Sequence, residues 1–129
     1  MNREIAASMP LAKLLGITIT QADSELVEGT LQVKEEFCTL GGSLHGGAIM
    51  TLADSLGAVA AFLNLPEGAT GTTTIESKTN FLRAAAAGTT VTGRTMAVNV
   101  GRRLSVWTTT ISDEDGKAIA VTTQTQLVI

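Results

Sequence analysis

The chain has 129 residues, close to the size of one domain, and residues 1–129 are expected to form a single unit. A hydrophobic fraction of 44% allows a buried core and excludes a disordered chain, while three Phe, one Trp and a net charge of −3 argue against nucleic-acid binding. One cysteine and one histidine allow no internal disulfide and argue against a metal site.

Residues 10–15 predict a short helix, because Pro10 suits the first turn of a helix and Gly16 suits the position just after its end. Residues 17–20 and 26–33 follow as a pair of strands. Residues 45–64 then predict a helix of about 30 Å that is apolar almost all round. A helix without a polar face is expected to be buried inside its domain.

Threonine, a β-branched residue suited to strands, occurs 20 times and gathers in the second half of the chain. Four long strands are predicted there, over residues 72–82, 89–100, 104–112 and 118–128. Turn signals separate the last three, at residues 100–103 and at the Asp-Gly pair of residues 115–116. The pattern predicts an α+β fold in which a mostly antiparallel sheet curls around the long helix.

No signal peptide is expected, because no long apolar run follows the start of the sequence. The longest apolar stretch, residues 56–63, is too short to cross a bilayer. We therefore expect a cytoplasmic protein with no membrane association.

Asp54 stands in the middle of the apolar helix, where a carboxylate loses much of its hydration. In a structural interpretation it forms hydrogen bonds at a crowded interface. In a catalytic interpretation it is a general base or nucleophile that lines a cleft.

His45, Gly46 and Gly47 open the same helix. Unpaired N–H groups at a helix start favour a developing oxyanion, and glycine lets a substrate approach the backbone closely. An ordinary helix start with a locally bonded histidine would have the same residues.

The spacing of His45 and Asp54 constrains any site that uses both. Nine positions separate them, which is about 13.5 Å along a helix and opposite faces of it. They cannot both touch one carbonyl within a single chain. We therefore predict an obligate homodimer with two equivalent shared sites.

Other catalytic patterns fit less well. Residues 41–45 lack the last glycine of a nucleophile elbow, and no phosphate-binding glycine loop is complete. Cys38, His45 and Asp54 have the residue types of a cysteine triad, but closeness in sequence does not establish its geometry.

Three arginines stand near predicted strand ends. Arg83 ends one strand, and Arg102 and Arg103 lie at a predicted hairpin tip. Guanidinium groups bind phosphates through paired donors, so the three could form a local phosphate clamp. The alternative is that they are solvated turn residues.

Residues 44–55, with His-Gly-Gly followed by an acid, resemble the signature of hotdog-fold acyl-CoA thioesterases. The similarity is to the phenylacetic-acid-degradation thioesterase family and its relatives that act on hydroxybenzoyl-CoA and 1,4-dihydroxy-2-naphthoyl-CoA. It continues through residues 75–83, 100–107 and 113–117. The resemblance implies a hotdog fold and a dimer, commonly paired into a tetramer, with active sites at the dimer interface. It also implies hydrolysis of an acyl-CoA to free acid and CoA without a metal or redox cofactor.

The resemblance assigns roles to individual residues. Asp54 corresponds to the catalytic carboxylate, acting as nucleophile or general base. The Gly46 N–H would polarise the thioester carbonyl, and His45 would position the thioester or its leaving thiolate. The residues that would contact the substrate or its CoA part are Gly47, Thr74, Arg83, Asn99, Gly101, Arg102 and Arg103.

One position departs from the pattern of that family. Relatives commonly carry Asn or Gln six residues before the histidine, and this chain has Thr39. Its shorter hydroxyl implies a shifted loop, or a contact that is missing or made through water. A non-catalytic acyl-CoA-binding or sensing module is therefore the alternative to an enzyme. In either case the acyl group, aryl or medium-chain, is expected between two central helices beside the small residues Ala48, Ala58 and Ala61.

Overall fold

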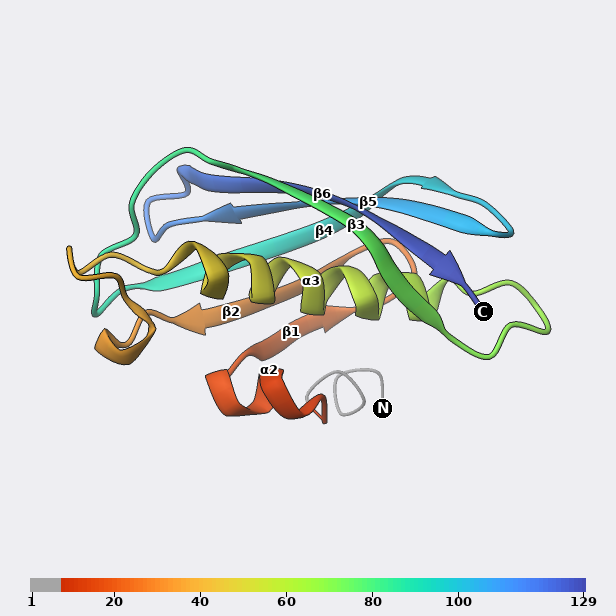
Figure 1. Cartoon of the computed structure of the whole chain (residues 1–129), viewed down its shortest axis with the longest axis horizontal. Coiled ribbons are helices and arrows are strands. Elements are labelled where there is room, and N and C mark those ends of the chain that lie inside the picture. Colours follow the sequence, from red (N-terminus) through yellow and green to blue (C-terminus); the bar gives the residue numbers. More distant parts are fainter. Residues whose placement is uncertain (1–7) are drawn as a thin grey trace.

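The structure, a computed structural model, describes residues 8–129 of the chain (Figure 1). The predicted helices and strands are confirmed, and their ends lie within two residues of the predicted ones. A short 3-10 turn, η1, was not predicted. In chain order the elements are α2 (Pro10–Leu15), β1 (Thr18–Ala22), β2 (Val27–Gln32), η1 (Glu35–Phe37), α3 (Gly46–Leu63), β3 (Thr72–Phe81), β4 (Thr90–Val100), β5 (Leu104–Ser112) and β6 (Ala118–Val128).

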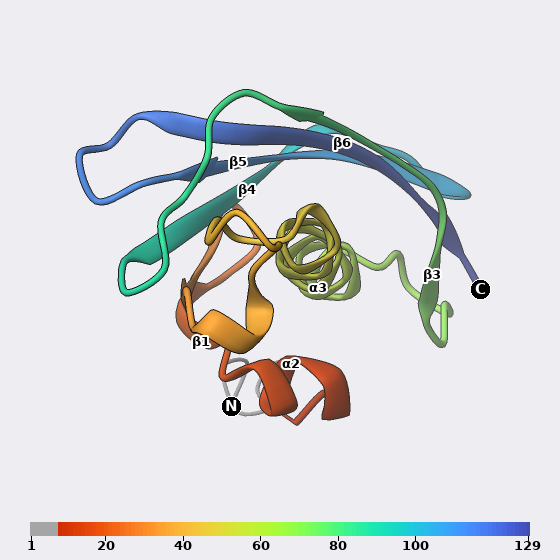
Figure 2. The same ribbon diagram turned by 60° about the vertical axis from the view of Figure 1, so that its left-hand side comes forward.

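The strands form one six-stranded sheet in the order β1-β2-β4-β5-β6-β3, and every neighbouring pair is antiparallel. The sheet curves around α3, as Figure 2 shows in a view nearly along that helix. β3 follows α3 in sequence but pairs with the last strand, β6, so it forms the far edge of the sheet. The antiparallel sheet around one long helix is confirmed.

Two glycines let α3 approach the sheet closely. Gly29 of β2 and Gly93 of β4 are paired in register. A Cβ at Gly93 would lie 2.6 Å from Leu56 Cδ1, and one at Gly29 would lie 2.8 Å from Leu56 Cδ2. The missing side chains therefore leave a hollow that receives Leu56, which is fully buried.

One face of α3 remains open in the single chain, so the expectation of a helix buried all round is wrong. Met50 and Phe62 are 36% and 45% exposed, and Thr51, Asp54 and Ala58 are half-buried. We call these five residues the open face of α3. The opposite side packs on the sheet through buried residues, which are Ile49, Leu52, Ala53, Leu56, Gly57, Val59, Ala60 and Ala61.

By length and composition α3 could cross a bilayer, although no uninterrupted apolar stretch in it is that long. It contacts β2, β3, β4, β5 and β6 along the inner face of the sheet. This is the arrangement of a core helix.

Candidate active site

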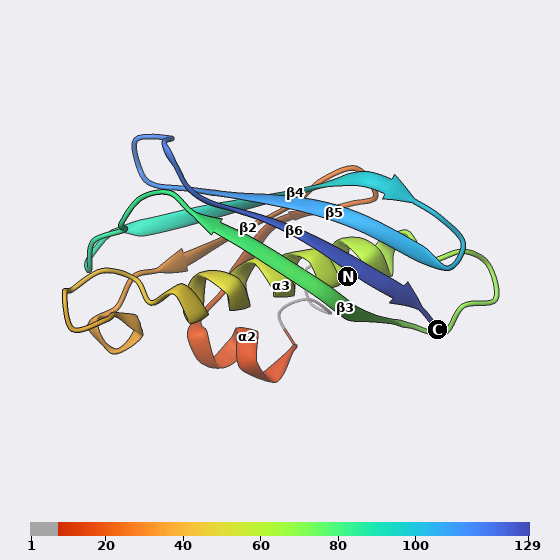
Figure 3. The same ribbon diagram turned by 45° about the horizontal axis from the view of Figure 1, so that its top comes forward.

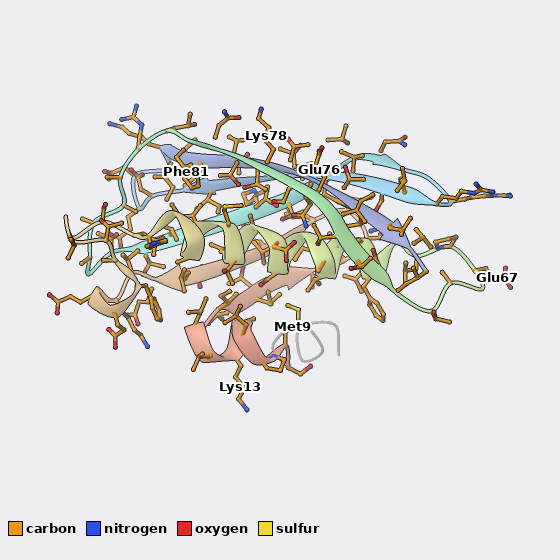
Figure 4. All side chains as sticks on the ribbon, in the orientation of Figure 1. Met9, Lys13, Glu67, Glu76, Lys78 and Phe81 are labelled. Carbon is orange, nitrogen blue, oxygen red and sulfur yellow. The ribbon has the colours of Figure 1, made fainter. Side chains whose placement is uncertain are left out.

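Asp54 lies on the open face of α3 and borders a groove of about 550 Å³. The groove runs between α3, β3 and the start of α2, and Figure 4 shows Met9 on the side of α2 that faces α3. Its other lining residues are Met9, Pro10, Leu11, Ala12, Met50, Thr51, Ser55, Ala58, Thr74 and Ser77. A mostly apolar groove with few polar groups is typical of a site for a small organic ligand.

Two neighbouring side chains hold the Asp54 carboxylate. The Thr74 hydroxyl donates a hydrogen bond of 2.7 Å to Oδ1, and the Gln124 amide donates one of 3.1 Å to the same oxygen. Thr74, which the resemblance places at the substrate, therefore lies directly beside Asp54 in the structure. Gln124 was not predicted.

A β-bulge at Ile75 places Thr74 in the groove. The register of β3 against β6 shifts between Thr74 and Glu76, so Ile75 has no partner in the ladder. Thr74 and Ser77, three residues apart, both turn inward as a result. Glu76 and Lys78 lie on the outer side of the sheet, away from α3 (Figure 4).

His45 is the N-cap of α3. Its Nδ1 accepts a hydrogen bond of 2.8 Å from the Gly47 N–H. A neutral imidazole that accepts at Nδ1 carries its proton on Nε2, so His45 presents a donor outward. The Gly46 N–H donates to none of the residues that the structure describes, and the Phe81 ring lies beside Gly46.

His45 and Asp54 open onto different hollows. Beside His45 lies a smaller one of about 270 Å³, which is also lined by Gly47 and Ala48, whereas Ala58 lines the Asp54 groove. This separation agrees with the nine-residue spacing on α3. Ala61, expected beside the acyl group, is instead buried in the core.

The structure does not bring the three arginines together within one chain. The Arg83 N–H donates to Ile119 O, and the Val128 N–H donates to Arg103 O. Nine residues of β6 separate these two contacts, which is about 30 Å along a strand. Arg83 and the β4–β5 tip therefore lie at opposite ends of the sheet (Figure 1).

The β4–β5 tip itself forms as predicted. It carries Asn99, Gly101, Arg102 and Arg103, and the Gly101 N–H closes it on Leu104 O at 2.8 Å. A Cβ at Gly101 would lie 2.8 Å from Leu104 O, which explains the glycine. Both arginines at the tip are exposed.

Comparison with known proteins adds independent evidence of ancestry. The sequence profile of the Thioesterase superfamily matches residues 41–120. The chain is 34% identical over 107 residues to the proofreading thioesterase EntH of Cronobacter turicensis, which covers 83% of this chain and 77% of that protein. It is also 34% identical over 103 residues to the 1,4-dihydroxy-2-naphthoyl-CoA hydrolase of Escherichia coli, which covers 80% of this chain and 74% of the hydrolase.

The chain belongs to the thioesterase superfamily. Its fold matches a crystal structure of a thioesterase from Haemophilus influenzae, with a TM-score of 0.89 and 31% identity over 98% of this chain and 87% of that one. The resemblance seen in residues 44–55 is thereby confirmed, and this hotdog thioesterase is a thioester hydrolase.

In this thioesterase the loop before α3 holds Thr39 away from both hollows. The exposed Thr39 bonds Ser43 through its backbone N–H and, at 3.3 Å, through its hydroxyl. Cys38 instead lines the hollow beside His45, and its thiol donates to Lys34 O. That thiol makes no contact with Asp54, so the cysteine triad does not form within the chain.

Sequence reasoning missed two site residues of the thioesterase, Gln124 and Gln126. Both are fully buried, on the inner face of β6. The sequence signal for them is their spacing. Gln124 and Gln126 are two residues apart on a predicted strand, so both amides lie on one face of it, and that face turns toward the helix. Within residues 8–129, no three His, Cys, Asp or Glu side chains lie together as a metal site.

Proposed function

We propose that the protein hydrolyses an acyl-CoA to a free acid and CoA, with each active site shared between two subunits. The observation that carries this proposal is the half-buried Asp54 carboxylate, held at one oxygen beside an apolar groove. Its helix begins at Gly46, whose N–H has no partner among residues 8–129. The E. coli relative named as a hydrolase of a CoA thioester supports CoA as the leaving group.

Each subunit contributes a different part of the chemistry: one provides Gly46 and His45, and the other provides Asp54. The thioester carbonyl accepts a hydrogen bond from Gly46 N–H, where the helix dipole stabilises the developing oxyanion. Asp54 of the other subunit either attacks the carbonyl carbon or removes a proton from the attacking water. Attack by Asp54 breaks the C–S bond and leaves the acyl group on Asp54 as a mixed anhydride, which water then hydrolyses to the free acid. With Asp54 as the base, the water oxygen attacks the carbonyl carbon and the C–S bond breaks to give the free acid directly. In both routes the CoA thiolate leaves with the electron pair and takes up a proton that the water supplies. The His45 Nε2–H would stabilise that thiolate or the thioester.

An unpaired strand edge and exposed apolar side chains along one side of the chain support a dimer. β3 is ten residues long and forms an edge of the sheet, beside α3 in Figure 3. Ile75 and Phe81 of β3 are 54% and 53% exposed. A second copy paired antiparallel along β3 would extend the sheet and cover the open face of α3.

The same pairing would bring Arg83 of one subunit close to Arg102 and Arg103 of the other. Antiparallel β3 strands place the Phe81 end of one chain beside the Thr72 end of the other. Thr72 pairs with Val128, which bonds Arg103. Arg83 of one subunit would thus approach Arg102 and Arg103 of the other, and together they would hold the CoA phosphates.

The acyl group would occupy the groove beside Asp54. Ala58 is small, and Met50 and Leu11 provide apolar surface, which suits an aryl or medium-chain acyl group. The non-catalytic alternative, an acyl-CoA sensor, is favoured only by the position of Thr39 outside both hollows.

CoA release tests the proposal. Hexanoyl-CoA, decanoyl-CoA and benzoyl-CoA would each be incubated with the protein, and the free thiol measured with a thiol reagent. We expect saturable release with at least one of them, and the order of rates identifies the acyl class. Saturable binding of all three without release would contradict hydrolysis and support the sensor.

A further inference from the structure

Two glutamines are fully buried on the inner face of β6, where Gln124 pairs with Trp107 of β5 and Gln126 with Ser105. An amide that is removed from water without hydrogen bonds strongly destabilises a protein. Gln124 and Gln126 therefore need partners, and those partners identify what the two residues do.

The glutamines belong to one directed chain of hydrogen bonds that ends on Asp54. Thr72 Oγ1 donates to Gln126 Oε1 at 2.9 Å, and Gln126 Nε2 donates to Thr74 Oγ1 at 2.6 Å. The single proton of the Thr74 hydroxyl is then committed to Asp54 Oδ1, at 2.7 Å. Gln124 Nε2 donates to the same oxygen directly, at 3.1 Å.

The two oxygens of Asp54 are consequently different. Oδ1 accepts two hydrogen bonds, whereas Oδ2 accepts none from any residue between 8 and 129. Hydrogen bonds to a carboxylate are stronger than those between neutral groups, so Oδ1 is held firmly. Rotation about the last side-chain bond of Asp54 would break both bonds.

Among residues 8–129, Asp54 is the hydrogen-bond partner that orients the Gln124 amide. Its other amide atom, Oε1, is buried and has no partner in the described part of the chain. Turning the amide over would point this oxygen at the carboxylate and remove the donor. Gly57 leaves the space that the amide fills, because a Cβ there would overlap the Gln124 side chain.

We propose that Gln124 is a positioning residue, which together with Thr74 fixes Oδ1 of Asp54 so that Oδ2 is the reacting atom. This inference rests on the proposed function. Oδ2 donates an electron pair either to the thioester carbon, as the C–S bond breaks, or to a proton of the attacking water. Gln124 itself touches neither the substrate nor the water.

Gln124→Met tests the role, because methionine has a similar length but no N–H. We expect kcat for the best of the three CoA thioesters to fall about 10- to 100-fold, since small misplacements of a reacting group have effects of this size. KM should change less than about threefold, because substrate binding does not involve Gln124. Thr122→Val is the matched control. Thr122 is buried on the same face of the same strand, and its hydroxyl bonds Thr79 instead. Its kcat should match the wild type.

Gln124→Glu adds a readout that a packing role would not change. The carboxyl group that this variant introduces can donate to Oδ1 of Asp54 while it is protonated, and it repels the Asp54 carboxylate once it ionises. The kcat of this variant should therefore fall as pH rises, relative to the wild type at each pH. Gln124→Met should lose the same factor at every pH.

Gly57→Ala provides a second route should Gln124→Met fail to fold. The new methyl group displaces the Gln124 amide from Asp54, so kcat should fall by a similar factor. Wild-type kcat in folded Gln124→Met or folded Gly57→Ala would overturn the inference. So would a pH profile of Gln124→Glu that parallels the wild type. The proposed function would still stand in these cases if Asp54→Asn is inactive, and it would fall if Asp54→Asn is active.

Discussion

Asp54→Asn is expected to lower kcat by at least about 10³-fold while the protein stays folded. The Asn carbonyl oxygen can still accept from Thr74 and Gln124, so the hydrogen bonds at Oδ1 are kept. An NH₂ group replaces Oδ2 and supplies no electron pair for the thioester or for water. CoA release and the thermal midpoint, measured on the same preparation, check both parts of this expectation.

Ser55→Ala is the control for Asp54→Asn. Ser55 is the next residue of α3 and borders the groove proposed for the acyl group, but no step of the proposed chemistry uses its hydroxyl, so its loss should change KM rather than kcat. Its kcat should stay within about twofold of the wild type, as for a change away from the reacting atoms. A folded Asp54→Asn protein with the rate of the wild type would exclude Asp54 as the catalytic carboxylate.

Gly46→Pro is expected to lower kcat by about 10²- to 10³-fold, which is the usual effect of removing one oxyanion donor. Proline deletes the Gly46 N–H and adds a small ring beside Phe81. Gly46 is the first residue of α3, where proline is favoured, and His45 already has the extended backbone, φ −61° and ψ 135°, that a following proline requires. The helix should therefore form normally, and the thermal midpoint should not fall.

Gly46→Ala separates the loss of the N–H from the added bulk. Its Cβ would lie 3.2 Å from the Phe81 ring, as a proline Cβ would, and the half-exposed ring can move by that amount. The N–H remains, so most of the activity should remain. Equal losses in the alanine and proline variants would show that space beside Phe81 matters and the N–H does not.

Local features of the sequence were enough to predict most of the fold. Pro10 and Gly16 bound α2, and the threonine-rich alternation marks the four long strands, because these signals act over a few residues. Position in the sheet depends on contacts between distant segments. The pairing of β3 with β6 and the bulge at Ile75 could not be predicted for that reason.

The sequence could predict those residues of the candidate site that lie close together in the chain and are chemically unusual where they stand. His45 and Asp54 stand out because a polar side chain is unusual in or beside an apolar helix, and Gly46 stands out because glycine at a helix start leaves the backbone N–H accessible. Gln124 did not stand out, because its role depends on a partner 70 positions away in sequence. The separation of Arg83 from Arg102 and Arg103 within one chain could not be predicted for the same physical reason, since the length of β6 lies between them.

Mixing two inactive variants tests most directly whether the site is shared between subunits. Asp54→Asn and Gly46→Pro chains would be unfolded together in equal amounts, refolded and assayed for CoA release. Half of the dimers would then contain one chain of each variant. Each of these heterodimers would hold one site with both Gly46 and Asp54 intact and one site with both replaced. We expect recovery of about a quarter of wild-type activity. Activity no higher than that of the two separate variants, in refolded mixed dimers, would contradict a shared site.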